Sequence, residues 1–190
     1  MKETIIQYMK RFSNLSDAEL EKIADALQVT TFEKGTILLH QGEVPDKCYF
    51  ILKGCVRQYA VDENGKEVTY NFFTEEESVT IFNQNANDLS SNYTICCMED
   101  CVLVEGDLAI EQDMYNLFPG LEKMTRKIIE NNISEMHYDF AAFMSSTPQE
   151  RYEELLKKRP GLENRVPQHQ LASYLGITPE SLSRIKKRIN

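Results

Sequence analysis

The sequence lacks the features that mark several large classes of protein. No apolar run approaches the roughly 20 residues that a helix needs to cross a bilayer, and residues 1–12 are too polar for a secretory signal peptide. No nucleophile motif, glycine-rich phosphate loop or paired histidine and carboxylate is present. We therefore expect a cytoplasmic protein with no membrane partner, which is not an enzyme and carries no cofactor or metal.

The cysteines are odd in number and have no zinc-type spacing. They are Cys48, Cys55, Cys96, Cys97 and Cys101. In a reducing compartment such residues favour packing as small apolar side chains, and a thiol redox sensor built from the last three is the alternative. His40, His137 and His169 fall one to an element, so no spacing supports haem or metal ligation.

Basic residues are scarce and unevenly placed. The chain has 21 Lys and Arg against 30 Asp and Glu, a formal net charge of −9, which is unusual for a protein that binds nucleic acid. Residues 148–190 hold 9 basic and 5 acidic residues, a net charge of +4, whereas residues 1–147 hold 12 and 25, a net charge of −13. The acidic part of the chain should repel the phosphate backbone of DNA, whereas the basic tail should attract it. This distribution of charge favours binding of the protein to DNA in one orientation.

The periodicity of the apolar residues changes from helical to strand-like early in the chain. Residues 1–27 have a helical pattern in which Ser16 and Glu19 form a capping box. From Val29 to Glu105, short runs rich in Val, Ile, Tyr, Phe and Thr alternate with glycines, which predicts seven or eight antiparallel strands in a sandwich or roll. The clearest hairpin is residues 62–65, where Asn-Gly accommodates positive φ at both central positions.

The helical period returns after Asp107. We expect a short helix to Tyr115 and a longer one from Pro119 to about Met144, along which apolar residues recur at steps of three and four. One interpretation is a helix that lies on its own sheet, and the other is a parallel coiled coil between two copies, in which a polar Asn fixes the register. The dimer-interface residues are then Leu121, Met124, Ile128, Asn132, Ile133, Met136, Phe140 and Phe143. Thr147 begins another helix and is the expected hinge.

The segment from Gln168 to Arg188 has the pattern of a helix-turn-helix. Ala172 leaves room for a close helix crossing, Gly176 accepts the positive φ of a sharp turn, and Thr178 caps the second helix. The outward face of that helix offers base readers near its start and phosphate-binding charges near its end. A generic helical hairpin explains the apolar pattern too.

In this order, the motifs resemble those of the Crp/Fnr superfamily of bacterial transcription regulators over nearly the whole chain. The matching segments are Phe32–Gly35, Gly42, Tyr49–Val56, Met98–Leu103, Glu150–Pro160 and Arg165–Pro167. The resemblance implies an α+β protein: an antiparallel, jelly-roll-like double-stranded β-roll with flanking helices (residues 1–117), a dimerisation helix (118–146) and an all-α helix-turn-helix domain (147–190). It also implies that Glu180 and Arg184 reach into the major groove of double-stranded DNA, where Arg suits guanine and Glu accepts from cytosine.

The predicted helix-turn-helix and the resemblance to the family lead us to expect nine DNA-binding residues. They are Gln168, His169, Thr178, Glu180, Ser181, Ser183, Arg184, Lys187 and Arg188. Because the chain closes at Asn190, we expect no C-terminal wing, so specificity rests on a homodimer that reads a palindrome with half-sites about 34 Å apart. A partner-binding or effector-binding module that has lost DNA binding is the alternative.

One feature of the family is missing from this sequence, and two polar segments need a separate interpretation. Nucleotide-binding members carry a phosphate cassette with an arginine, but no Lys or Arg occurs between Lys66 and Lys123. A buried phosphate without a cation is severely penalised, so we expect an effector other than a cyclic nucleotide, of unknown identity. The polar stretch 83–92 occupies the cassette's place and is either a surface loop or the cover of a different cavity. The acidic run 75–77 is interpreted as a solvated face rather than as acid-base machinery.

Overall fold

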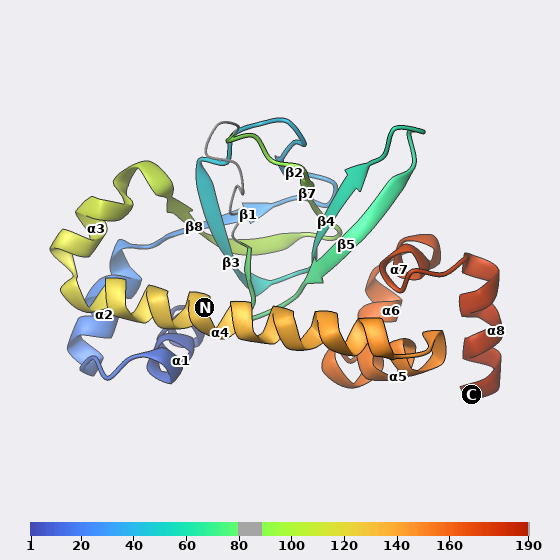
Figure 1. Ribbon diagram of the computed structural model, residues 1–190. Helices are drawn as coiled ribbons and strands as arrows, with labels where there is room; N and C mark the ends of the chain where they lie inside the picture. Colours follow the sequence, from blue (N-terminus) through green and yellow to red (C-terminus); the bar gives the residue numbers. More distant parts are fainter. Residues whose placement is uncertain (80–88, 190) are drawn as a thin grey trace.

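The structure, a computed structural model, describes residues 1–79 and 89–189 (Figure 1). Two helices open the chain, α1 (Lys2–Phe12) and α2 (Asp17–Ala26). The predicted capping box is confirmed at α2: the Ser16 backbone N–H donates to Glu19 at 2.9 Å, and the Glu19 N–H donates to the Ser16 hydroxyl at 3.4 Å. This reciprocal pair satisfies two of the donors that the first turn leaves without helical partners.

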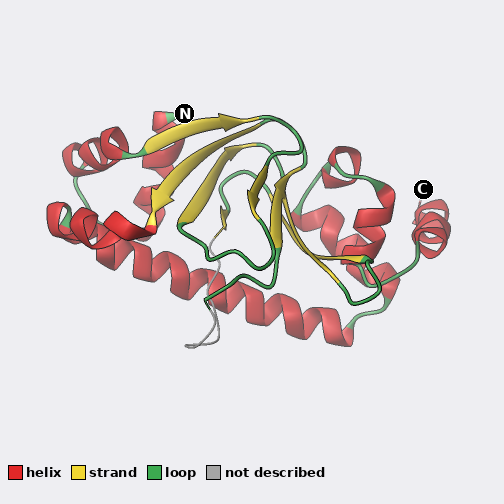
Figure 2. Ribbon diagram, turned by 90° about the horizontal axis from the view of Figure 1, so that it is seen from above, coloured by secondary structure: helices red, strands yellow, loops and turns green. Residues whose placement is uncertain are grey.

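Eight strands follow among the described residues and form two antiparallel sheets of four strands each, with the orders β1-β8-β3-β6 and β2-β7-β4-β5. Their bounds are β1 Gln28–Phe32, β2 Ile37–Leu39, β3 Lys47–Lys53, β4 Val56–Val61, β5 Glu67–Phe73, β6 Ser78–Val79, β7 Thr94–Cys97 and β8 Cys101–Asp107. The view from above shows the two sheets as layers of one roll (Figure 2). The predicted antiparallel roll with flanking helices is confirmed.

The hairpin between β4 and β5 has a different turn from the one predicted. Gly65 has φ +77°, but Asn64 has no positive φ. The Asp62 carboxylate instead accepts the backbone N–H groups of Asn64 and Lys66, each at 2.9 Å. Because this side chain organises a longer loop, one left-handed residue is enough to reverse the chain.

Helices make up the rest of the chain. They are η1 Leu108–Ile110, α3 Glu111–Leu117, α4 Pro119–Ser145, α5 Pro148–Lys158, α6 Leu162–Arg165, α7 Gln168–Tyr174 and α8 Pro179–Ile189. The long helix α4 passes without a break through Asn131 and Asn132 and runs below the roll from the N-terminal helices to the tail (Figure 1). Thr147 and Glu150 form a second capping box at the start of α5, as the sequence predicts. No described helix is both long and apolar enough to span a bilayer.

Three apolar cores hold these elements together. The first lies between the two sheets and includes Ile51, Ile95 and Leu103, which are 0–1% exposed. The second joins α1, α2, β8 and the start of α4. The third belongs mainly to the tail but includes Cys55 and Phe72 of the roll, both 0% exposed. The tail is therefore packed on the roll rather than tethered beside it.

Candidate nucleic-acid interface

The helix-turn-helix is formed by α7, a tight turn and α8. Leu171 and Leu182 are 0% exposed and pack the two helices against each other. Ala172 is also 0% exposed, so its single methyl group allows the close approach that the sequence predicts. Gly176 has φ +69°, a conformation that L side chains rarely adopt, and it turns the chain between the helices.

The start of α8 is held by side chains at the surface. The Thr178 hydroxyl accepts the backbone N–H of Ser181 at 3.2 Å, which confirms the predicted cap, and Pro179 occupies the first helical position. The Gln168 amide donates to the Pro179 carbonyl at 3.2 Å, which ties the start of α7 to the start of α8. His169 lies exposed beside it. The N-terminal ends of both helices are thereby brought together.

One face of α8 collects the charged residues proposed to meet DNA. Glu180, Arg184, Lys187 and Arg188 are exposed and recur at steps of three and four, whereas Ser183 is half-buried at the edge of this face. Arg184 donates to the Ser181 hydroxyl at 3.2 Å. The pKa of Glu180 is lowered by its backbone N–H, the Thr178 hydroxyl and the Arg184 charge, so this carboxylate is ionised at neutral pH.

The three cations on this face have no carboxylate partner in the described part of the chain. Arg184, Lys187 and Arg188 take part in none of its ion pairs. The neighbouring Lys186, on the opposite side of α8, pairs with Glu163 at 2.7 Å. The last turns of α8 therefore present unneutralised positive charge in one direction only, at the end of the molecule away from the N-terminal helices (Figure 1).

Other cations of the tail attach it to the rest of the chain. Arg165 makes a bidentate pair with Glu75, at 2.8 and 2.9 Å, and also reaches Glu99 at 2.5 Å. Arg159 pairs with Glu77 at 2.8 Å. Glu75 and Glu76 are exposed, as the interpretation of residues 75–77 as a solvated face expects, but this face also forms ion pairs that the sequence did not predict. The partners of Glu77 and Glu75 lie 82 and 90 residues away along the chain, and no local pattern reveals them.

These contacts determine the ionisation of the groups involved. Burial raises the pKa of Glu75, but hydrogen bonds from Arg165 and from the Gly54 backbone N–H outweigh it, and the net shift is downward. The pKa of Arg165 is raised by its hydrogen bonds to Glu75 and Glu99. Both partners are consequently charged across the neutral range.

Apolar and backbone contacts complete the junction between roll and tail. The Phe72 and Tyr174 rings meet edge to face with their centroids 5.6 Å apart. Beside them the Thr69 backbone N–H donates to the Ser173 hydroxyl at 3.0 Å. Strand β5 therefore contacts α7, the first of the last two helices, directly, and Leu182 and Ile185 of α8 belong to the same apolar cluster as Phe72.

The tail is also attached to the end of α4. Arg151 donates to the carbonyls of Phe143 and Leu175, each at 3.1 Å, and its guanidinium lies 3.8 Å from the Phe143 ring centroid. Lys158 of α5 forms an ion pair with Asp139 of α4. The roll, α4 and the tail are thus in contact with one another on both sides of Thr147, the cap of α5.

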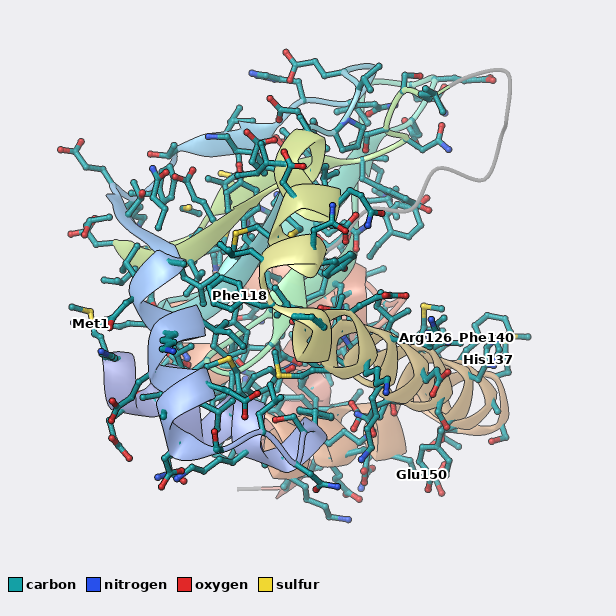
Figure 3. All side chains as sticks on the ribbon, turned by 90° about the vertical axis from the view of Figure 1, so that its left-hand side faces the viewer. Met1, Phe118, Arg126, His137, Phe140 and Glu150 are labelled. Atoms are coloured by element: carbon teal, nitrogen blue, oxygen red, sulfur yellow. The ribbon has the colours of Figure 1, made fainter. Side chains whose placement is uncertain are left out.

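The expected dimer-interface residues of α4 fall into two groups. Leu121, Met124 and Ile128 pack against α1 and α2, and Met124 is only 4% exposed, so these side chains serve the chain's own second core. The other apolar residues leave a stripe open on the opposite side. Its members and their exposed fractions are Ile133 42%, Met136 61%, Phe140 66%, Phe143 36% and Met144 68%. Asn132 is half-buried beside this stripe, and Arg126, His137 and Phe140 line the side of α4 away from the N-terminal helices (Figure 3).

One cavity formed by described residues of the roll is small. It has a volume of about 10 Å³, and its lining includes Leu39, Tyr49 and Ile95 together with the charged residues Asp46 and Lys47. That volume is close to the least that holds one water molecule. The buried Arg57 does not serve it: this side chain pairs with Glu67 at 2.6 Å and lies on the Phe72 side of the sheet. The polar stretch 83–92 falls largely outside the described residues, so its expected role stays a prediction.

The cysteines pack as the sequence predicts in three of the five positions. Cys55, Cys97 and Cys101 are at most 1% exposed, and Cys48 and Cys96 are half-buried. Burial raises the pKa of the Cys55 thiol to about 12, which leaves it protonated and unreactive at neutral pH. Among residues 1–79 and 89–189, no three His, Cys, Asp or Glu side chains gather where they could hold a metal ion.

Comparison with known proteins places this architecture. Residues 29–113 match the cyclic nucleotide-binding domain family. A segment of 67 residues is 34% identical to the cAMP-dependent protein kinase regulatory subunit of Blastocladiella emersonii, and covers 35% of this chain and 17% of that relative. The matched segment is therefore a small part of the kinase subunit.

Solved structures resemble nearly the whole chain. FixK2 from Bradyrhizobium japonicum superposes with a TM-score of 0.68, at 14% identity over 86% of this chain and 84% of that one. The c-di-GMP responsive global regulator CLP of Xanthomonas campestris gives 0.67 at 16% identity, over 92% and 91%. The catabolite activator protein of Thermus thermophilus gives 0.53 at 18% identity, over 94% and 85%. Residues 29–113 therefore resemble the cyclic nucleotide-binding domain family, and the chain as a whole has the fold of the Crp/Fnr-type transcription regulators.

Proposed function

We propose that the protein is a sequence-specific DNA-binding transcription regulator of the Crp/Fnr type. The observation that carries this proposal is the outer face of α8, where Arg184, Lys187 and Arg188 form no ion pair with a carboxylate of the described residues. A helix of this kind enters the major groove with its first turns on base edges and its basic end near phosphates. The other basic residues of the tail make contacts within the protein. We therefore expect DNA to approach the tail from one side, the outer face of α8.

We propose that two copies act together through the open stripe of α4. Five apolar side chains exposed by 36–68% along one helix face form an apolar strip of the kind that marks an interaction site. A coiled-coil contact of two such helices buries the strip on both copies and is isologous. The dimer would present two α8 helices, which matches a palindromic site with half-sites about 34 Å apart.

The effector that we propose is a small molecule other than a cyclic nucleotide. Residues 67–122, where the phosphate cassette is expected, contain no Lys or Arg, and the small cavity of the roll that Lys47 lines has a volume of about 10 Å³. Cyclic phosphate needs both a cation and room for a nucleotide. Isothermal titration with cyclic AMP and cyclic GMP tests this point, and micromolar binding of either would contradict it.

Binding of purified protein to genomic fragments tests the regulator proposal. Arg184→Ala is expected to abolish the preference between sequences, because we assign this side chain to a base edge. Lys187→Ala is expected to weaken all sequences alike and to reduce the salt slope by about 1, as loss of one phosphate contact does. Lys186→Ala is the matched control, since its ammonium pairs with Glu163 on the other side of the helix. If the wild-type protein shows no sequence preference, a module that binds a partner or effector is the better explanation.

A further inference from the structure

Three consecutive glutamates in the turn between β5 and β6 each pair with a different arginine from a distant part of the chain. Glu75 binds Arg165 and Glu77 binds Arg159, both at 2.8 Å, and both arginines belong to the tail. The middle residue, Glu76, instead binds Arg11 of α1 at 2.7 Å. One turn of the roll therefore holds the tail at two points and the N-terminal helix at a third.

The two carboxylates that face the tail are positioned by the roll itself. One oxygen of Glu75 accepts the Gly54 backbone N–H at 2.9 Å. One oxygen of Glu77 accepts the Thr74 N–H at 2.5 Å. Each carboxylate is thus oriented before the tail docks, so little ordering is needed when the arginine binds.

In these two ion pairs, the arginine of the tail is less exposed to solvent than the glutamate of the turn. The Arg159 side chain is 15% exposed and that of Arg165 is 24% exposed. Arg159 also donates to Asn71 and to the Tyr174 hydroxyl, each at 3.3 Å, so it contacts both β5 and α7. If the Glu77 carboxylate were removed, the partly buried Arg159 guanidinium would keep its desolvation cost without a carboxylate partner. If the Glu75 carboxylate were removed, Arg165 would keep only Glu99, at 2.5 Å. The ion pairs therefore favour one placement of the tail over others.

The same turn is tied to the core of the roll. The backbone N–H of Ile51 donates to the Glu77 carbonyl at 3.0 Å, and the Glu76 N–H donates to the Ile51 carbonyl at 2.9 Å. Ser78 and Val79 follow at once as β6, and Val79 lines the small cavity between the sheets. Glu77 is therefore separated from a residue that lines the cavity by Ser78 alone.

We propose that Glu75 and Glu77 are specificity-determining residues that set the orientation of the tail on the roll, and through it the spacing of the two half-sites that the dimer accepts. The proposal rests on the proposed function, since it concerns two recognition helices on DNA. With the tail fixed on roll and α4, the two α8 helices stand at one separation. Without these ion pairs the tail keeps its apolar contacts with the roll and the Arg165–Glu99 pair, but it loses two of the contacts that orient it, so it would tolerate more than one separation.

Glu75→Gln and Glu77→Gln, separately and together, test the proposal in the full-length protein. The substitutions keep size and remove charge, and Glu76→Gln is the matched control in the same turn. Amide hydrogen exchange reads the tail without DNA. Exchange in α7 should become about 5- to 10-fold faster in the double variant, from the loss of hydrogen bonds to charged groups, whereas Glu76→Gln should accelerate α1 alone.

The preferred spacing is measured with a series of palindromic DNA sites whose half-sites are moved apart by one or two base pairs. The affinity of each variant is determined for every site in the series. The double variant should lose about 5- to 10-fold in affinity for the best site, keep its affinity for a single half-site, and lose the preference between spacings. Unchanged α7 exchange would overturn the proposal, and so would faster exchange with an unchanged spacing preference. If the wild-type protein binds no DNA, the proposed function fails, and the exchange data still decide whether the turn holds the tail.

Discussion

Phe140→Ala should separate the proposed dimer into monomers. The Phe140 side chain is 66% exposed on the open stripe of α4. A phenylalanine buries about 200 Å² when fully covered, so about 130 Å² remains for a partner, worth about 3 kcal/mol at about 25 cal/mol per Å². A two-fold dimer contains this contact twice, for a total of about 6 kcal/mol. Alanine retains part of the area and association has its own ordering costs, so we expect about half of that total to be lost, or a roughly 100-fold weaker dimer.

Sedimentation across a concentration series measures this loss. Tyr138→Ala is the matched control, because Tyr138 is 70% exposed on the other side of α4, where Lys158 lies 5.4 Å from its ring. It should change the dimer constant by less than about 3-fold, as expected of a side chain outside the interface. Equal effects of the two substitutions, or no effect of Phe140→Ala, would refute the reasoning that the stripe is the interface.

Three further predictions concern the junction and the turn. Phe72→Ala should lower the free energy of unfolding by about 3–5 kcal/mol, because this fully buried ring joins roll and tail; a loss under about 1 kcal/mol in urea unfolding would contradict that role. Gly176→Ala should cost about 1 kcal/mol or more in the same assay, since φ is +69° and a Cβ would lie 3.3 Å from the Phe143 ring. The pKa of Glu75 is lowered in the folded state, so its contribution is complete above the ordinary value of 4.5 and is lost as pH falls through the lowered value. Urea unfolding from pH 7 to pH 3 should therefore show a smaller decline in Glu75→Gln than in the wild type, and parallel curves would contradict it.

Local chemistry was readable in the sequence wherever a residue and its partner lie within a few positions. The capping boxes at Ser16 and Thr147 and the glycine turn at Gly176 are examples, because each depends on backbone groups at most three residues away. The hairpin at 62–65 was located correctly but given the wrong turn, since the Asp62 side chain reorganised it. The exposed face of α8 follows from the helical period alone.

Contacts between distant segments could not be predicted in the same way. In the sequence, Glu75 and Glu77 belong to an acidic run that is typical of a solvent-exposed turn. No residue near them indicates that they form ion pairs with Arg165 and Arg159. Likewise, one helical period runs through all of α4, and only the packed structure divides it at about Ile128 into a part covered by α1 and α2 and a part left open.

By itself, the sequence determined the order of the elements, the antiparallel roll and the helix-turn-helix at the end of the chain. These depend on periodicity, caps and turns, which are short-range properties of the backbone. The tertiary structure alone decided where the tail packs, which of its cations form ion pairs with the rest of the chain and which stay outside those ion pairs on the surface of α8. Charge pairs form between groups that folding brings together, and their free energy depends on distance and burial that no spacing along the chain encodes.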